Sequence, residues 1–165
     1  MPRIGWVGLL TLCWLSWPAP AAAHHFTIDL KVQAGKNSAT VHAETAAIGV
    51  KPKERSVLRV KAGSRVAVQW TLTNTDAKAA FKNVLVHFFA VKQEKLNQVA
   101  PAKLLKGVVA ESALTIDFAP KDGTKGELTF TIDIPGFYHL RLETIGAAVG
   151  VDGHEHYAAL DLIVE

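Results

Sequence analysis

Apolar and polar residues alternate along most of this chain, and no stretch keeps a helical period over three turns. In FTIDLKVQ (residues 26–33) the apolar residues occupy every even position, and threonine, aspartate, lysine and glutamine occupy the odd positions. Successive side chains of a β-strand point to opposite faces of its sheet, so this pattern predicts a strand with one buried face. The chain is therefore expected to be all-β.

Eight further segments show the same alternation, and they are separated by turn-forming stretches such as AGKNS, TNTDAK and PKDGTKG. The predicted strands are 26–33, 39–46, 56–62, 65–74, 83–92, 112–119, 126–134, 137–144 and 154–165. Only residues 96–109 lack the pattern, which leaves room for a short helix or an irregular crossing. Short strands with these breaks indicate a two-sheet antiparallel β-sandwich.

The first 23 residues differ from the rest of the chain in composition. Arg3 precedes an apolar run from Ile4 to Trp17, and the alanines at 21–23 match a signal-peptidase site. The run is about 14 residues long, whereas a membrane-spanning helix needs roughly 20. We expect residues 1–23 to be a signal peptide and residues 24–165 to form one soluble domain, secreted or periplasmic, without a membrane span.

Processing after Ala23 would remove the only cysteine and the only methionine of the sequence. Thiolate nucleophiles, disulfides and Cys-containing metal sites are then excluded, so any metal has to be bound by histidine, carboxylate, backbone or the new amino terminus. Loss of Arg3 also lowers the formal net charge from +3 to +2. The balance argues against nucleic acid as the partner, because phosphate binding normally requires a concentrated basic surface.

The sequence contains no P-loop, no G-x-S-x-G elbow, no H-E-x-x-H and no G-x-G-x-x-G. Its carboxylates are scattered over the polar sides of the predicted strands, as at Asp29, Asp117 and Asp133. We therefore expect a protein that is not an enzyme.

Two segments resemble parts of immunoglobulin-like and cupredoxin-like bacterial sandwiches. LRVKAGSRVAVQWTLTNTDAKAAFKNVLVHFFAVK (58–92) is similar to their opening strands, and PGFYHLRLE (135–143) is similar to their penultimate strand, with Tyr138 near a corner. The resemblance implies architecture and no activity. In that architecture Trp70, which shares the phase of Val66, Val68 and Leu72, would be the buried core tryptophan.

Four of the seven histidines form two groups at the two ends of the processed chain. His24 and His25 come first, and His154 and His156 open the last predicted strand. Residues i and i+2 of a strand project to the same side, so His154 and His156 suit two ligands of one metal ion. In an immunoglobulin-like sandwich with seven alternating strands, the first and last strands run in the same direction, which would bring both groups to one end.

Cleavage after Ala23 would also give His24 a free amino group, whose pKa is ordinarily about 7.7–8.0. An amine together with imidazoles makes a nitrogen-rich set that favours Cu(II), with Zn(II) second. The terminal histidine on a sandwich resembles that of periplasmic copper-binding sandwiches and of copper oxygenases of the histidine-brace kind, but oxygenase activity is not implied. We expect a metal site formed by His24, His25, His154 and His156 that serves storage, delivery or sensing.

A different interpretation stays open. The two terminal histidines could be solvated, and His154 and His156 share the phase of the apolar residues of the last strand, so they could simply cap the core. The chain would then be a noncatalytic interaction or adhesion module whose partner is another exported protein. Of the remaining histidines, His42 is expected to be exposed, and hydrogen-bonded structural roles are expected for His87 and His139.

Overall fold

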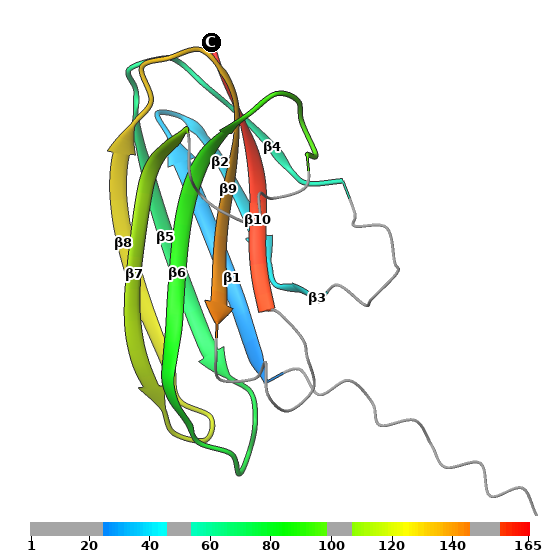
Figure 1. Cartoon of the computed structure of the whole chain (residues 1–165), viewed down its shortest axis with the longest axis vertical. Helices are drawn as coiled ribbons and strands as arrows, with labels where there is room; N and C mark the ends of the chain where they lie inside the picture. Colours follow the sequence, from blue (N-terminus) through cyan, green and yellow to red (C-terminus); the bar gives the residue numbers. More distant parts are fainter. Residues whose placement is uncertain (1–24, 46–53, 99–106, 146–155) are drawn as a thin grey trace, which may run out of the picture.

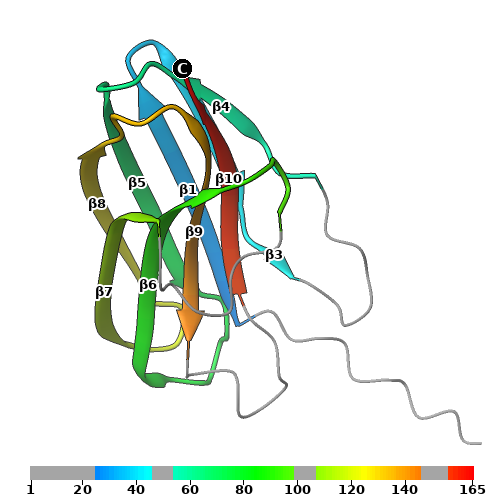
Figure 2. The same ribbon diagram turned by 45° about the horizontal axis from the view of Figure 1, so that its top comes forward.

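The structure, a computed structural model, describes residues 25–45, 54–98, 107–145 and 156–165. These ranges form ten β-strands in two facing sheets, and none of them contains a helix that is long and apolar enough to cross a membrane. Figures 1 and 2 show the two layers packed face to face. The predicted all-β sandwich is thus confirmed. The predicted signal peptide lies outside the described residues, as do residues 99–106 of the segment without alternation.

The smaller sheet has four antiparallel strands in the order β2-β1-β5-β8. Their bounds are β2 (Asn37–His42), β1 (Phe26–Ala34), β5 (Arg65–Asn74) and β8 (Gly123–Thr131).

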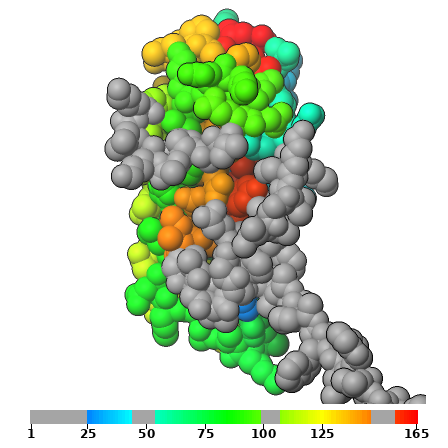
Figure 3. Space-filling view, turned by 45° about the vertical axis from the view of Figure 1, so that its right-hand side comes forward, coloured from blue at the N-terminus to red at the C-terminus, as the bar shows by residue number. Residues whose placement is uncertain are grey.

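The larger sheet has six strands, five of them in the order β3-β10-β9-β6-β7, and the sixth, β4, pairs with β10. Their bounds are β3 (Glu44–Thr45), β10 (His156–Val164), β9 (Gly136–Ile145), β6 (Phe81–Gln93), β7 (Val108–Phe118) and β4 (Val57–Val60). In Figure 3 the segments of β9, in orange, and β10, in red, lie side by side on one face of the molecule.

Two strands have other bounds than predicted, because β7 begins at Val108 instead of 112 and β8 spans Gly123–Thr131 instead of 126–134. Two details of strand pairing also differ from the predicted pattern of nine antiparallel strands. The predicted strand 39–46 is divided, because β2 belongs to the smaller sheet and β3 to the larger one, and the amide of Ala43 between them donates to the carbonyl of Ile28 at 2.7 Å. The predicted strand 56–62 is β4, which pairs with β10 in parallel while the other strand pairs are antiparallel. Neither difference changes the two-sheet architecture.

The core lies between the sheets and follows the sequence alternation. Along β1, buried and exposed residues alternate without interruption, and Ile28, Leu30 and Val32 are fully buried. They face leucines of the larger sheet such as Leu160, which is also fully buried. Each such side chain contributes about 1.5–3 kcal/mol by leaving water. Trp70 is buried at 7 % exposure in the predicted core phase.

Tyr138 occupies the corner position that the sequence resemblance implies. Its ring is fully buried, and its hydroxyl donates a hydrogen bond to the carbonyl of Ile134 at 2.7 Å. The bond returns to the backbone four residues upstream, which is the arrangement of a sandwich tyrosine corner.

The first and last strands run in the same direction, as Figure 1 shows for β1 and β10. Phe26 at the beginning of β1 contacts Phe81, Phe118 and His156. One end of the sandwich therefore contains the beginnings of β1, β6 and β10 and the ends of β5 and β7. We call this end the histidine pole.

Candidate metal site

Two of the four predicted ligands meet at the histidine pole. His25 directly precedes β1, and His156 is the first residue of β10, where it stands opposite Thr144 of β9 and Thr45 of β3. The centres of the two imidazole rings are 6.3 Å apart, with the ring planes at 71°. The two ends of the chain, 131 positions apart, thus bring imidazoles side by side, which follows from the shared direction of β1 and β10.

Both imidazole rings pack against phenylalanine rings at the end of the core. His25 lies 5.3 Å from the ring of Phe81, and His156 lies 6.0 Å from the ring of Phe26, measured between ring centres. Phe26 also contacts Phe118 at 5.2 Å. The histidines are 9 % and 2 % exposed, so the pole places nitrogen donors where the apolar core shields them from water on one side.

The separation of the rings can be compared with the geometry of a shared metal ion. An ion bound at about 2.0–2.1 Å by a ring nitrogen lies about 3.2 Å from the ring centre, so two imidazoles on one ion have centres at most about 6.4 Å apart. The observed 6.3 Å falls just within this limit, so the two rings would stand nearly opposite each other across the ion, as trans ligands in a square-planar Cu(II) site do. Within the described residues, no group of three or more His, Cys, Asp or Glu side chains converges to hold a metal.

The other two predicted ligands, His24 and His154, lie outside the described residues. His156 shares the buried phase of Ala158, Leu160 and Leu162, so it contributes to the end of the core as the alternative interpretation requires. Burial of this kind is compatible with ligation, because a hydrophobic shell around a metal site limits the access of solvent to the ion. The metal site itself stays a prediction.

A carboxylate that the sequence interpretation did not single out stands beside His25. Oδ2 of Asp76 lies 3.7 Å from Nδ1 of His25, and the side chain of Asp76 is 30 % exposed. The amides of Ala79 and Lys78 donate to its Oδ1 and hold the pKa of Asp76 below its usual value. In the sequence, Asp76 is marked only as part of the turn-forming stretch TNTDAK. The nearness of Asp76 to His25 depends on the pairing of β1 with β5.

Asn74, the last residue of β5, fixes this turn from inside the protein. It is fully buried, its Nδ2 donates to the carbonyls of Ala79 at 2.9 Å and Ala119 at 2.8 Å, and its Oδ1 accepts from the amide of Asp76 at 2.9 Å. The next residue, Thr75, donates its amide to the carbonyl of His25 at 2.8 Å. The Asp76 turn and the beginning of β1 are therefore one hydrogen-bonded unit.

The remaining histidines of the described ranges lie elsewhere and contact carboxylates. His42 is exposed, as predicted, and its Nδ1 is 2.5 Å from Oδ1 of Asp29. His87 stands between Glu143 and Glu111, with 3.0 Å from a ring nitrogen to each carboxylate. The contacts of His87, like that of His139 with Asp161, agree with the hydrogen-bonded structural roles predicted for both residues.

His139 lies five positions from Thr144 along β9, and its Nδ1 is 3.4 Å from Oδ1 of Asp161. Because Thr144 stands opposite His156, a five-residue stretch of strand separates His139 from the histidine pole, about 16 Å at 3.3 Å per residue. This position agrees with its exclusion from the predicted ligand set.

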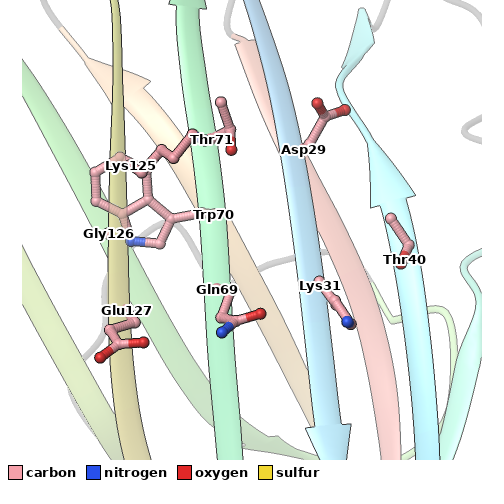
Figure 4. Close-up of a pocket in the computed structure, with 9 residues that line it drawn as sticks. All are labelled: Asp29, Lys31, Thr40, Gln69, Trp70, Thr71, Lys125, Gly126 and Glu127. Carbon is pink, nitrogen blue, oxygen red and sulfur yellow. The ribbon is translucent and has the colours of Figure 1, made fainter.

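A shallow groove of about 490 Å³ crosses the smaller sheet, and Figure 4 shows its lining residues. Strands β1 and β8 supply Asp29, Lys31, Lys125 and Glu127, so both charge signs are present. These are the exposed positions of alternating strands. The groove is consistent with a solvated sheet surface, and its charge pattern selects no ligand.

No protein-family model and no curated protein matches the chain. Solved structures with a similar fold include the C-terminal domain of Wzt, with 11% identity, a TM-score of 0.41 and coverage of 81% of this chain and 73% of that one. The PmoD soluble domain from Methylocystis sp. ATCC 49242 has 10% identity, a TM-score of 0.40 and coverage of 82% and 97%. The catalytic domain of the LPMO Lmo2467 from Listeria monocytogenes has 14% identity, a TM-score of 0.39 and coverage of 74% and 80%.

Proposed function

We propose that this chain is an exported β-sandwich protein of immunoglobulin-like or cupredoxin-like type that binds Cu(II), and secondarily Zn(II), at the histidine pole. The ligands are His24, His25, His154 and His156. The observation that carries the proposal is the 6.3 Å separation of the His25 and His156 rings, which originate at opposite ends of the sequence. The role is binding for storage, delivery or sensing, without catalysis.

Chain connectivity supports the inclusion of the other two ligands. His24 is bonded to His25, and His154 is two residues from His156. These short connections of one and two residues are the reason for proposing His24 and His154 as ligands of the same ion. Four imidazoles and one terminal amine can then serve a single ion, and such a nitrogen-rich set suits Cu(II).

Copper titration of the processed protein tests the proposal. The protein begins at His24, and Cu(II) binding is followed by electron paramagnetic resonance. The spectrum of the bound Cu(II) is expected to show hyperfine structure from several nitrogen ligands. Replacement of His156 by phenylalanine, which keeps an aromatic ring at the end of the core, should weaken binding and reduce the nitrogen hyperfine structure.

Two controls sharpen this experiment. The exposed His42 offers a matched variant, His42→Gln, which should leave the copper affinity unchanged because the His42 ring lies on the exposed side of the smaller sheet, where it contacts Asp29. A form with one glycine before His24 displaces the terminal amine and should weaken binding. If the processed protein binds no copper or zinc tightly, the proposal is wrong, and the interaction module that binds another exported protein is favoured.

A further inference from the structure

The position of Asp76 beside His25 bears on how the proposed metal would be bound. Oδ2 of Asp76 faces Nδ1 of His25 at 3.7 Å, while the ring of His25 is 11 % exposed and packs against Phe81. A histidine that binds a metal commonly donates its other ring N–H to a carboxylate, which selects the tautomer and orients the ring. Asp76 stands on the Nδ1 side of His25 at an ion-pair distance, and an approach of about 0.5–1 Å would turn the contact into a hydrogen bond of this kind.

The geometry of the turn leaves one oxygen of Asp76 for this purpose. Its Oδ1 accepts the amides of Lys78 at 2.7 Å and Ala79 at 2.8 Å, which closes the turn. These bonds direct Oδ2 toward His25. Backbone bonds keep the two residues in place, because Thr75 donates to the carbonyl of His25 and the amide of Asp76 donates to the buried side chain of Asn74.

We propose that Asp76 is a positioning residue that accepts the Nδ1 proton of His25 and thereby presents Nε2 of His25 to the metal ion. The inference rests on the proposed function, since it names the ligand atom of the same site. A turn-closing role alone would require only Oδ1, and it would leave the tautomer of His25 independent of the second oxygen.

The substitution Asp76→Asn separates these roles. The amide oxygen of asparagine can still accept the amides of Lys78 and Ala79, so the turn is retained. The NH₂ group then replaces Oδ2 and presents a donor to Nδ1 of His25. The variant is therefore expected to shift His25 toward the tautomer with the proton on Nε2, which blocks the nitrogen that the metal needs.

The tautomer of His25 can be measured with long-range ¹H–¹⁵N correlation spectra of ¹⁵N-histidine-labelled protein. The spectra are recorded at about pH 8, above the usual titration range of histidine. In the metal-free protein we expect the proton of His25 on Nδ1, and in Asp76→Asn a shift toward Nε2. Added Zn(II) should move the Nε2 resonance of His25 in the unsubstituted protein. Loss of the orienting carboxylate should lower the affinity for Zn(II) and Cu(II) about 10- to 100-fold.

Asp29→Asn is the matched control, because Asp29 contacts the exposed His42 in a similar carboxylate–imidazole pair. It should leave both the His25 tautomer and the metal affinity unchanged. Metal binding with an unchanged affinity and tautomer in Asp76→Asn would overturn this inference and leave the proposed function standing. If the unsubstituted protein takes up neither metal, both are overturned.

Discussion

His139 and Asp161 face each other across β9 and β10 on the outer side of the larger sheet, with 3.4 Å between Nδ1 and Oδ1. They are 1 % and 0 % exposed, although their positions alternate with those of the core residues. Nε of Arg55 donates to Oδ1 of Asp161 at 2.7 Å, and the amide of Asn97 donates to Oδ2 at 2.6 Å. Asp161 thus joins β9, β10 and two loop segments in one buried polar cluster.

Asp161→Asn is expected to destabilise the protein strongly. The substitution keeps the size of the side chain but leaves the guanidinium of Arg55, whose side chain is 13 % exposed, without its anion. Removing one partner of a buried ion pair costs on the order of 3 kcal/mol. Urea unfolding at pH 7 should show a free energy of unfolding lower by about this amount.

The ion pair between Arg59 and Glu165 supplies the matched control. Its nitrogen–oxygen distance is 3.2 Å, and the two side chains are 62 % and 63 % exposed. Glu165→Gln should change the free energy of unfolding by less than about 1 kcal/mol, because exposed pairs are screened by water. Equal effects of the two substitutions would contradict the importance of burial at Asp161.

The same cluster makes stability depend on pH in the acid range. Burial alone would raise the pKa of Asp161, but hydrogen bonds from His139, Arg55 and the Asn97 amide outweigh it and lower the pKa from 3.8 to about 2. Because the pKa in the folded state is below that of the unfolded chain, ionised Asp161 stabilises the protein above about pH 4, and this stabilisation is lost as the pH falls toward 2.

This loss amounts to about 2 kcal/mol. The free energy of unfolding of the unsubstituted protein should be measured with urea at several pH values from about 5 to 2. The same measurement on Asp161→Asn gives the pH dependence due to the other carboxylates, and the difference between the two proteins is the contribution of Asp161. The free energies of the two proteins should converge toward pH 2. A constant difference over this range would show that the charge of Asp161 is not the source.

The strands could be predicted from the sequence because burial on one face is a local pattern. In β1 and β5 the alternation of residue types reproduces the alternation of exposure, and the bounds of β5 match the predicted 65–74. The division of 39–46 between two sheets could not be predicted in this way. Which sheet a strand joins depends on partners far away in the sequence, as for Ala43 and Ile28.

Part of the candidate site could also be predicted from the sequence. The shared direction of the first and last strands predicts that His25 and His156 lie at one end, and the structure places their rings 6.3 Å apart. Asp76 could not be found, because its turn follows β5 and reaches His25 only through the antiparallel register in which Asn74 stands opposite Phe26. Pairing between strands determines such contacts, and no local pattern encodes it.

Gly126→Ala is expected to destabilise the sandwich through a steric clash. Gly126 of β8 stands opposite Trp70 of β5, and Figure 4 shows the indole reaching across to β8. A Cβ atom at Gly126 would lie 2.2 Å from Cζ2 of Trp70, so the indole has to move. Overpacking of this kind costs about 1–3 kcal/mol, which urea unfolding can measure.

Fluorescence gives this prediction a local readout. Residues 24–165 contain Trp70 as their single tryptophan, so emission of the processed protein reports on this ring alone. In Gly126→Ala the emission should move to longer wavelength as the indole becomes more exposed. In a Trp70→Leu background the same glycine substitution should cost less, and strictly additive effects would show that the two residues do not clash.

Asn74→Ala should reduce both stability and metal binding, because Asn74 supports the turn that carries Asp76. The substitution removes two hydrogen bonds to carbonyls and one from the Asp76 amide, all within a fully buried region. The expected decrease in the free energy of unfolding is about 3 kcal/mol, since the backbone partners lose their bonds away from water. At a temperature where the variant is still folded, calorimetric titration with Cu(II) should show weaker binding. A destabilised variant with undiminished copper affinity would contradict this prediction, and it would mean that copper binding does not depend on the support that Asn74 gives to the turn.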